Sequence, residues 1–316
     1  MRTKEELTAR SLKGIWAGVT LPWKKDYQLD EDIFRENLRR LCKVEVHGIY
    51  TTGSTGEFYA LSLKEFQNMV NILLEVVGPT GIPIQVGCAS PNTRDTLAMV
   101  EYVADKGCDG VQVALPYWMK LTDNELLHFF RDVSRACDSL PLIHYNVPRA
   151  KRFLYGPDYQ RILEVAPNLI GVKFTFASSH FSQLREAIYL TPELSYFVSE
   201  DILVSAMQLG AKGSYSSLVC LNPSFMLKMF DLAEARQWDE AIKMQQRGAR
   251  FLDEAGTLLE ELGEGGMDPV ADKGFAVASG FFAGHQRTRP PYIGWSDEGL
   301  KKIRSWFRAN YPELVY

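Results

Sequence analysis

One pattern repeats along most of this chain: a short apolar run, then a segment with helical spacing, then a turn. Most of the apolar runs lack an alternation of apolar and polar residues, which is typical of parallel strands covered on both faces. Eight such units in succession predict an α/β fold, a (β/α)8 TIM barrel, rather than an open doubly wound sheet. No G-x-G-x-x-G motif follows the first run, which argues further against a dinucleotide-binding sheet. The eight runs are 14–21, 47–53, 83–88, 109–115, 140–146, 170–175, 194–199 and 212–217.

Start and stop signals support helices between these runs. Asp30 precedes one helical segment, and Ser62 with Glu65 three residues later forms the pattern of a capping box before another. After about residue 223 the pattern becomes purely helical. We therefore predict a barrel over residues 1–223 and a C-terminal helical region over 224–316. No low-complexity linker separates the two parts, so we expect them to pack as one body.

Composition excludes several classes of function. The net charge of −4 and the absence of a basic cluster argue against a nucleic-acid partner. Five cysteines without a C-x-x-C pair, and five histidines without an H-x-x-x-H arrangement, argue against a disulfide framework and against a metal site. No stretch approaches the ~20 apolar residues of a membrane span. The charged N-terminal stretch "MRTKEELTARSLKG" has no apolar core typical of a signal peptide, so we expect a cytoplasmic protein.

A lysine interrupts one of the apolar runs. In "LIGVKFTFASS" (169–179), Lys173 lies in a segment otherwise typical of a buried strand, and an unpaired buried charge is costly. Desolvation by Val172 and Phe174, or by neighbouring strands, would lower the pKa of the amine from its usual ~10.4. A neutral amine attacks a ketone or aldehyde to form a Schiff base. Two other interpretations stay open: Lys173 pairs with a buried carboxylate, or it extends to solvent at the strand end.

Barrel enzymes carry their catalytic residues at the carboxyl ends of the strands, and polar residues gather at these positions here. Tyr145 ends the fifth run, where its phenol can move protons for a neighbouring lysine adduct. The segment "GSTGE" (53–57) follows the second run, and its backbone N–H groups and hydroxyls can hold a carboxylate. Each feature also has an ordinary structural interpretation, as a core tyrosine or a strand-to-helix turn. Together they predict a site for a 2-oxo acid bound as an imine. Further hydroxyls at strand ends are Thr175, Ser216 and Ser217.

The stretches "GSTGEFYALSLKE", "YNVP" and "GVKFT", in this order and spacing, resemble the dihydrodipicolinate synthase / N-acetylneuraminate lyase superfamily of class I aldolases. The resemblance covers essentially the whole chain. It implies that Lys173 forms a Schiff base with pyruvate or another 2-oxo acid and that Tyr145 is the proton relay. Ser54 and Thr55 would hold the substrate carboxylate, with Thr55 counted among the catalytic residues as well. Gly53 and Thr175 would complete this part of the substrate site. The resemblance implies no metal or organic cofactor, and a homotetramer or homodimer.

Two departures count against the synthase of lysine biosynthesis. Dihydrodipicolinate synthases have "PYYN" after the fourth strand, whereas this chain has "PYWMK", in which Trp118 replaces a tyrosine and Tyr117 remains nearby. They also have an arginine two residues after "YNVP", where this chain has Ala150, and Arg149 lies one position early.

Two other branches of the superfamily match different stretches. The sialic acid lyases share "GSTGE" and the K-x-T of Lys173, and Glu200 with Asp201 stands in place of their acidic pair, although the glycine expected before that pair is missing. The aromatic hydratase-aldolases, which act on benzylidenepyruvates, are similar in "PYWMK", "YNVPRAKRF", "SYSSLVCLNP" and "AGHQRTRPPY", but usually depart from "GSTGE". In that branch Trp118 and Tyr215, beside Ser216 and Ser217, would contact a flat apolar tail. A place for Trp118 in a subunit interface is the alternative.

We therefore expect a lyase that cleaves a 2-oxo acid reversibly into pyruvate and an aldehyde, or a hydratase-aldolase. A sugar-acid lyase, a 2-keto-3-deoxy acid dehydratase and a dihydrodipicolinate synthase-type condensation are the alternatives. Outside these reactions, a non-catalytic sensor of 2-oxo acids remains open. A phosphate-ester chemistry is disfavoured because "GAKGSYSS" is only a weak version of the phosphate-binding loops of such barrels.

Overall fold

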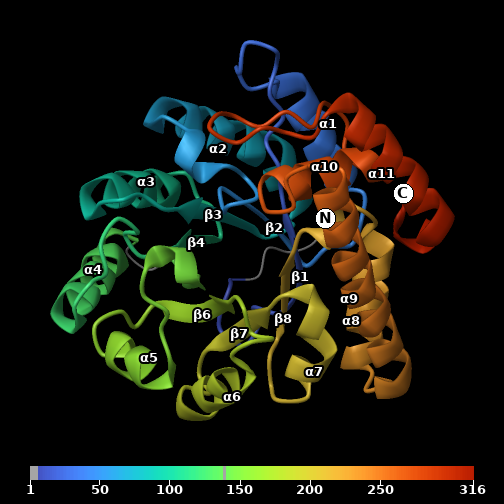
Figure 1. The fold of residues 1–316 in the computed structure, drawn as a ribbon. Coiled ribbons are helices and arrows are strands. Elements are labelled where there is room, and N and C mark those ends of the chain that lie inside the picture. Colours follow the sequence, from blue (N-terminus) through green and yellow to red (C-terminus); the bar gives the residue numbers. More distant parts are fainter. Residues whose placement is uncertain (1–5, 138–139) are drawn as a thin grey trace.

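The computed structural model describes residues 6–137 and 140–316. Its eight parallel strands close into a barrel in sequence order, with β8 paired to β1 (Figure 1). This confirms the predicted (β/α)8 fold, and each strand overlaps the run expected for it. The strands are β1 (Gly14–Gly18), β2 (Gly48–Thr51), β3 (Ile84–Cys88), β4 (Gly110–Val113), β5 (Leu142–Asn146), β6 (Leu169–Phe174), β7 (Ser195–Val198) and β8 (Gly213–Ser216). Residues 1–5 lie outside the described residues. They are the first residues of the predicted barrel part and of the charged N-terminal stretch.

Helices follow the strands around the outside of the barrel (Figure 1). The expected caps are present: the Asp30 side chain accepts a hydrogen bond from the backbone N–H of Ile33, and Ser62 and Glu65 form a capping box. The helices are α1 (Glu31–Leu41), α2 (Leu63–Val77), α3 (Thr93–Asp105), α4 (Asp123–Ala136), α5 (Gly156–Leu163), α6 (Phe181–Leu190), α7 (Leu203–Met207), α8 (Pro223–Glu234), α9 (Trp238–Glu261), α10 (Val270–Ser279) and α11 (Asp297–Asn310). No helix of the described part of the chain is long and apolar enough to cross a membrane.

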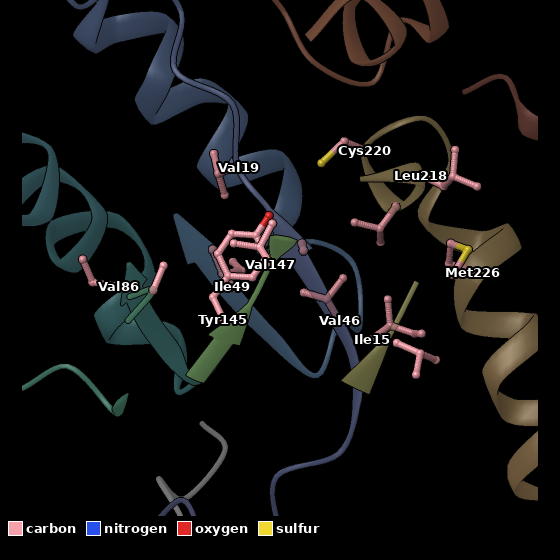
Figure 2. Packing of buried hydrophobic residues seen from close by; sticks show 14 of the residues in the cluster. Ile15, Val19, Val46, Ile49, Val86, Tyr145, Val147, Leu218, Cys220 and Met226 are labelled. Atoms are coloured by element: carbon pink, nitrogen blue, oxygen red, sulfur yellow. The ribbon is translucent and has the colours of Figure 1, made fainter. Parts of the chain in front are cut away.

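The larger hydrophobic core lies between the strands and the surrounding helices. Figure 2 shows part of it, with Ile15 of β1, Ile49 of β2 and Val86 of β3 among the labelled side chains. Val172 and Phe174 of β6 belong to this outer core. Because side chains alternate along a strand, Lys173 between them points into the barrel instead.

A second, smaller cluster fills the barrel interior. Its centre is Tyr215, whose ring centroid lies 5.7 Å from that of Trp16, 5.0 Å from that of Tyr50 and 4.7 Å from that of Phe197. These aromatic rings close the barrel below Lys173, so the interior is packed and the open end is the carboxyl end of the strands.

The C-terminal helices are built onto this carboxyl end. Helix α8 follows β8 directly and contacts β1, in the place of the barrel's own eighth helix. Helix α10 packs against α11 and against the short turn after β8. Lys273 of α10 forms a buried ion pair with Glu57 of the loop after β2. A contact of this kind agrees with the expectation that both parts pack as one body, while the division near residue 223 stays a prediction.

Candidate active site

Lys173 lies among tyrosines inside the mouth of the barrel. Its Nζ donates a hydrogen bond of 2.9 Å to the hydroxyl of Tyr50. The same nitrogen lies 4.4 Å from the ring centroid of Tyr145, 4.9 Å from that of Tyr50 and 5.8 Å from that of Tyr215. Within the described residues it forms no ion pair with a carboxylate. The apolar surroundings of the Lys173 amine therefore come from strands β2, β5 and β8. Val172 and Phe174, the other source considered from the sequence, do not provide them.

Tyr145 is placed beside Lys173 by strand register. The two residues are direct partners in the pairing of β5 with β6. The Tyr145 hydroxyl lies 3.3 Å from Oγ of Ser54, and burial is the main cause that raises the pKa of the phenol. The neighbouring Lys173 opposes this increase in the pKa. Tyr145 thus stays protonated near neutral pH and can both donate and accept a proton through its hydroxyl.

The loop after β2, residues 53–57, is a tight turn with available donors. Within the described part of the chain, the backbone N–H groups of Ser54 and Thr55 donate no hydrogen bond. Gly53 keeps this loop close to the interior, because a Cβ there would lie 3.2 Å from the ring of Tyr50. Free backbone donors in a turn are a recurrent anion-binding arrangement, so the loop can hold a carboxylate. We call residues 53–57 the nest loop.

The hydroxyls of the nest loop already have protein partners. Ser54 Oγ accepts a hydrogen bond of 3.2 Å from Nη1 of Arg149, in addition to its contact with Tyr145. Thr55 Oγ1 donates a hydrogen bond of 2.5 Å to Oδ2 of Asp272. Each hydroxyl is thus oriented by a second group, and the backbone N–H groups of Ser54 and Thr55 are the donors of the loop that remain available.

Two cavities meet at the Tyr145 side chain. The first, of about 360 Å³, contains Lys173 and is lined also by Thr175, Glu200, Ser217 and Asp272; we call it the lysine cavity. The second, of about 420 Å³, is mainly apolar; we call it the aromatic cavity. Its rings come from Phe58, Tyr59, Tyr117 and Tyr292. Tyr145, Met267 and Asp268 line both cavities.

Three carboxyl groups line the lysine cavity, and each has different hydrogen-bonding partners. Asp268 makes a two-pronged ion pair with Arg149, at 3.0 Å and 2.6 Å. Glu200 accepts from the Ser216 hydroxyl at 3.0 Å and from the backbone N–H of Leu218 at 3.2 Å. Asp272 accepts a hydrogen bond from Thr55, and burial is the largest cause that raises its pKa to about 7.

Not every residue expected from the sequence reaches the lysine cavity. Thr175 and Ser217 line it, and Tyr215 lies beneath Lys173 with its hydroxyl donating to Gln85 at 2.6 Å. Ser216 is fully buried and does not line the cavity, and its hydroxyl donates a hydrogen bond to Glu200. Trp118 is 78% exposed and lines neither cavity, so within one chain it makes no part of a substrate pocket. The physical reason is its place beyond the strand end, in a loop that turns it toward solvent.

Sequence reasoning missed Tyr50, Asp268 and Asp272. Tyr50 looked like any aromatic residue of a buried strand, and only its distance to Lys173 shows its role. The two aspartates lie in the C-terminal helical region, and Asp272 is 217 positions after Thr55 in the sequence. The one available signal was "MDPVADKG" (267–274), in which charged residues stand within an otherwise apolar helix start. Among the described residues, no three histidines, cysteines or acidic residues are grouped as metal ligands would be.

Comparison with known proteins gives a consistent result. A family model described as the dihydrodipicolinate synthetase family matches residues 11–257. A 4-hydroxy-tetrahydrodipicolinate synthase of Methanothrix thermoacetophila is 30% identical over 220 residues, which cover 69% of this chain and 72% of that protein. An uncharacterized DapA-like lyase of Thermococcus kodakarensis is 26% identical over 299 residues, 93% of this chain and 98% of the relative.

Solved structures show the same fold. YagE of E. coli K12, a prophage protein of the dihydrodipicolinic acid synthase family solved with pyruvate, superposes with a TM-score of 0.83 at 21% identity, covering 94% of this chain and 98% of YagE. CdNal of Clostridium difficile, solved with mannosamine, superposes with a TM-score of 0.81 at 24% identity, covering 95% and 99%. At these identities the likeness is one of fold.

Proposed function

The chain belongs to the dihydrodipicolinate synthetase family, whose members are lyases and synthases, and from this premise we propose that it is a Schiff-base-forming lyase. The proposed reaction is the reversible aldol cleavage of a 2-oxo acid into pyruvate and an aldehyde, or the related hydratase-aldolase reaction. Lys173 is the nucleophile, Tyr145 the proton relay, and the nest loop the carboxylate site. No organic cofactor or metal enters this scheme.

One observation carries the proposal: Lys173 lies inside the barrel with no carboxylate partner among residues 6–137 and 140–316. An ammonium group that is paired with a carboxylate is held in its charged form and is a poor nucleophile. Lys173 instead contacts the hydroxyl of Tyr50 and the faces of three tyrosine rings. Its amine also opens into the lysine cavity. This is the arrangement that an imine-forming lysine needs.

The steps follow from these positions. The Lys173 amine attacks the 2-oxo carbon, and Tyr145 supplies the proton with which the carbinolamine hydroxyl leaves as water. The resulting iminium withdraws electrons from C3. The Tyr145 phenolate left by that step takes the proton of the hydroxyl on C4. The C3–C4 bond then breaks, an aldehyde leaves, and the electron pair forms the C2=C3 double bond of an enamine while the imine nitrogen takes the iminium electrons. Protonation of C3 and hydrolysis by one water then release pyruvate and free Lys173.

The substrate tail is proposed to be uncharged and aromatic or otherwise hydrophobic. The aromatic cavity is lined by Tyr145 and by four further aromatic rings, which suit a flat apolar tail. Arg149 is already paired with Asp268 in a two-pronged ion pair. A dihydrodipicolinate synthase substrate carries a second carboxylate, and here the Arg149 guanidinium is not free to bind it. This observation disfavours the condensation reaction named for the Methanothrix relative.

A sugar-acid lyase or a 2-keto-3-deoxy acid dehydratase is the second candidate, favoured by a specific feature of the lysine cavity. Glu200 and Ser217 line the lysine cavity and do not line the aromatic cavity. Carboxylates and hydroxyls of this kind accept hydrogen bonds from the hydroxyls of a sugar-derived tail. The two candidates differ in which cavity holds the tail.

We also propose that the chain assembles into a homo-oligomer, a dimer or tetramer. Trp118 and Met119 are adjacent and 78% and 71% exposed, and exposed apolar side chains side by side often mark an interface. Light scattering on the purified protein measures the assembly directly. A monomer at micromolar concentration would contradict this part of the proposal.

The function is tested by release of pyruvate, measured with lactate dehydrogenase and NADH. The probes are 4-hydroxy-2-oxo-4-phenylbutanoate, with an aromatic tail, and 2-keto-3-deoxygluconate, with a polyol tail. We expect turnover of the aromatic probe by the wild type and none by Lys173→Ala. Lys302→Ala, on the exposed face of α11, is the matched control and should behave as the wild type. Turnover by Lys173→Ala would refute the lysine mechanism, and preference for the polyol probe would favour the second candidate.

A further inference from the structure

A carboxyl group from the C-terminal region enters the lysine cavity. Asp272 lies in the first turn of α10 and lines the same cavity as Lys173. Thr55 of the nest loop donates to its Oδ2 at 2.5 Å. The neighbouring Ser54 contacts the hydroxyl of Tyr145 at 3.3 Å. Two adjacent hydroxyls of the nest loop thus hold two different proton-carrying groups, Tyr145 from β5 and Asp272 from α10.

The other two carboxyl groups of the cavity have fixed partners. Asp268 is engaged with Arg149 through both of its oxygens. Glu200 accepts hydrogen bonds at Oε1 from the backbone and hydroxyls at the end of β8. Asp272 has neither a cationic partner nor a backbone donor among the described residues. It is therefore the carboxyl group of this cavity that can take up and release a proton.

The groups facing Asp272 support this exchange. Burial raises the pKa of Asp272 most, followed by the negative charge of Asp268, and Glu200 adds to the effect. Hydrogen bonds from Thr55 and Ser217 oppose it, and the pKa comes to about 7. The nearby Tyr50 and Cys220 have their pKa values raised well above the usual range by burial, so they are neutral. Among the described residues that line this cavity, Lys173 is the one basic side chain. A general acid or base works best when its pKa lies near the working pH.

We propose that Asp272 is a second catalytic proton-transfer residue, which acts at C3, the carbon next to the imine carbon of pyruvate bound to Lys173. This rests on the proposed function. In the direction of condensation the C3–H bond breaks and its electron pair forms the C2=C3 bond. The imine nitrogen takes the iminium electrons, and the proton goes to the Asp272 carboxylate. In cleavage, the Asp272 carboxyl group returns the proton to C3 of the enamine. Tyr145 then transfers protons to and from the oxygen atoms of the substrate, and Asp272 to and from C3.

Pyruvate alone tests this division of labour, because formation of the enamine exchanges the methyl protons of pyruvate with solvent. The exchange in D2O is followed by NMR for the wild type, Asp272→Asn and the control Glu298→Gln, an exposed position of α11. In parallel, borohydride traps the pyruvate imine, and mass spectrometry measures the trapped fraction. For Asp272→Asn we expect normal trapping and an exchange rate lower by about 100-fold, the lower range for loss of a general base.

Each outcome decides the matter. Exchange reduced tenfold or more with trapping intact supports the proposal. A smaller reduction overturns it, and so does loss of trapping in a folded Asp272→Asn protein, because Asp272 would then only support the site. If Asp272→Asn does not fold, the wild type still tests the proposal: exchange per trapped imine must rise through a transition near pH 7, and a flat profile overturns it. A wild type that traps no pyruvate refutes the proposed function, and this inference with it.

Discussion

Two lysines lie at the carboxyl end of the barrel, Lys273 fully buried and Lys173 partly buried, and their partners differ. Lys273 of α10 is 1% exposed, forms an ion pair with the fully buried Glu57, and donates to the backbone carbonyl of Arg287 at 2.8 Å. Lys173 of β6 has no ion-pair partner among the described residues, and its hydrogen bond goes to the hydroxyl of Tyr50. Lys173 lines a cavity, whereas Lys273 lines neither of the two cavities described above.

The difference separates a structural lysine from a reactive one. Glu57 also accepts from the indole N–H of Trp23 at 2.8 Å and from the backbone N–H of Arg289 at 2.9 Å. The Lys273–Glu57 pair therefore fixes the nest loop to the C-terminal region. Burial lowers the pKa of Lys273 to about 8, and Glu57 opposes this effect. Burial alone thus does not identify a nucleophilic lysine. What distinguishes Lys173 from Lys273 is that it lacks a carboxylate partner among the described residues and that its amine opens into a cavity.

The largest effect on stability is expected at the structural lysine. Lys273→Met leaves Glu57 buried without its cation, which should lower the free energy of unfolding by about 3–5 kcal/mol. Lys173→Met removes no ion pair and should change it by less than about 1.5 kcal/mol. Urea denaturation of both variants measures the contrast. The double variant Glu57→Gln/Lys273→Met should recover part of the loss, and equal losses in the two single variants would contradict the comparison.

A smaller effect is expected at the hydroxyl that holds Lys173. Tyr50→Phe removes one hydrogen bond, which contributes about 0.5–1.5 kcal/mol, and keeps the ring that packs on Tyr215. The rate of imine trapping with pyruvate should fall by up to about tenfold, since 1.4 kcal/mol is a factor of ten. Complete loss of trapping would show instead that Tyr50 takes part in the chemistry, and an unchanged rate would show that the bond is without consequence.

The smallest effect on stability is expected at Glu65, which contacts the same C-terminal segment as the Lys273–Glu57 pair, and this effect depends on pH. Arg289 donates to Glu65 at its side chain and to Glu57 at its backbone, and the Arg289 bond lowers the pKa of Glu65 to about 2. A carboxyl group with a lowered pKa stabilises the fold above its unfolded pKa, and this stability is lost as pH falls from about 4.5 toward 2. Glu65→Gln should cost at most about 1 kcal/mol at pH 7. The difference in stability between Glu65→Gln and the wild type, measured by thermal unfolding, should shrink as the pH falls over that range. A constant difference would contradict the stabilising role of the Arg289–Glu65 pair.

The sequence was sufficient for the barrel and for part of the site. Eight apolar runs separated by helical segments left little choice of architecture, and Lys173, Tyr145 and the nest loop were identifiable because each lies at a strand end. The sequence left open which groups surround the Lys173 amine. In the structure, strand pairing places Tyr145 beside Lys173, and the closed barrel brings tyrosines of two further strands to the same amine.

Other parts of the site depend on contacts between distant segments. Asp272 meets Thr55 across 217 residues of sequence, and nothing in a local pattern distinguishes its carboxyl group from Asp268 or Glu200. The resemblance of "PYWMK" to the hydratase-aldolase branch predicted Trp118 either at the substrate or in a subunit interface. The loop turns it to solvent at 78% exposure, because a loop residue beyond a strand end is not bound by the alternation that directs strand residues.

The most direct test of the account maps the pyruvate adduct onto the two lysines. The wild type and Lys173→Arg are incubated with pyruvate and borohydride, digested, and analysed by mass spectrometry. The account predicts one adduct per chain, on the peptide that contains Lys173, with an unmodified Lys273 peptide and no adduct in Lys173→Arg. An adduct on Lys273, or one that persists in Lys173→Arg, would contradict it.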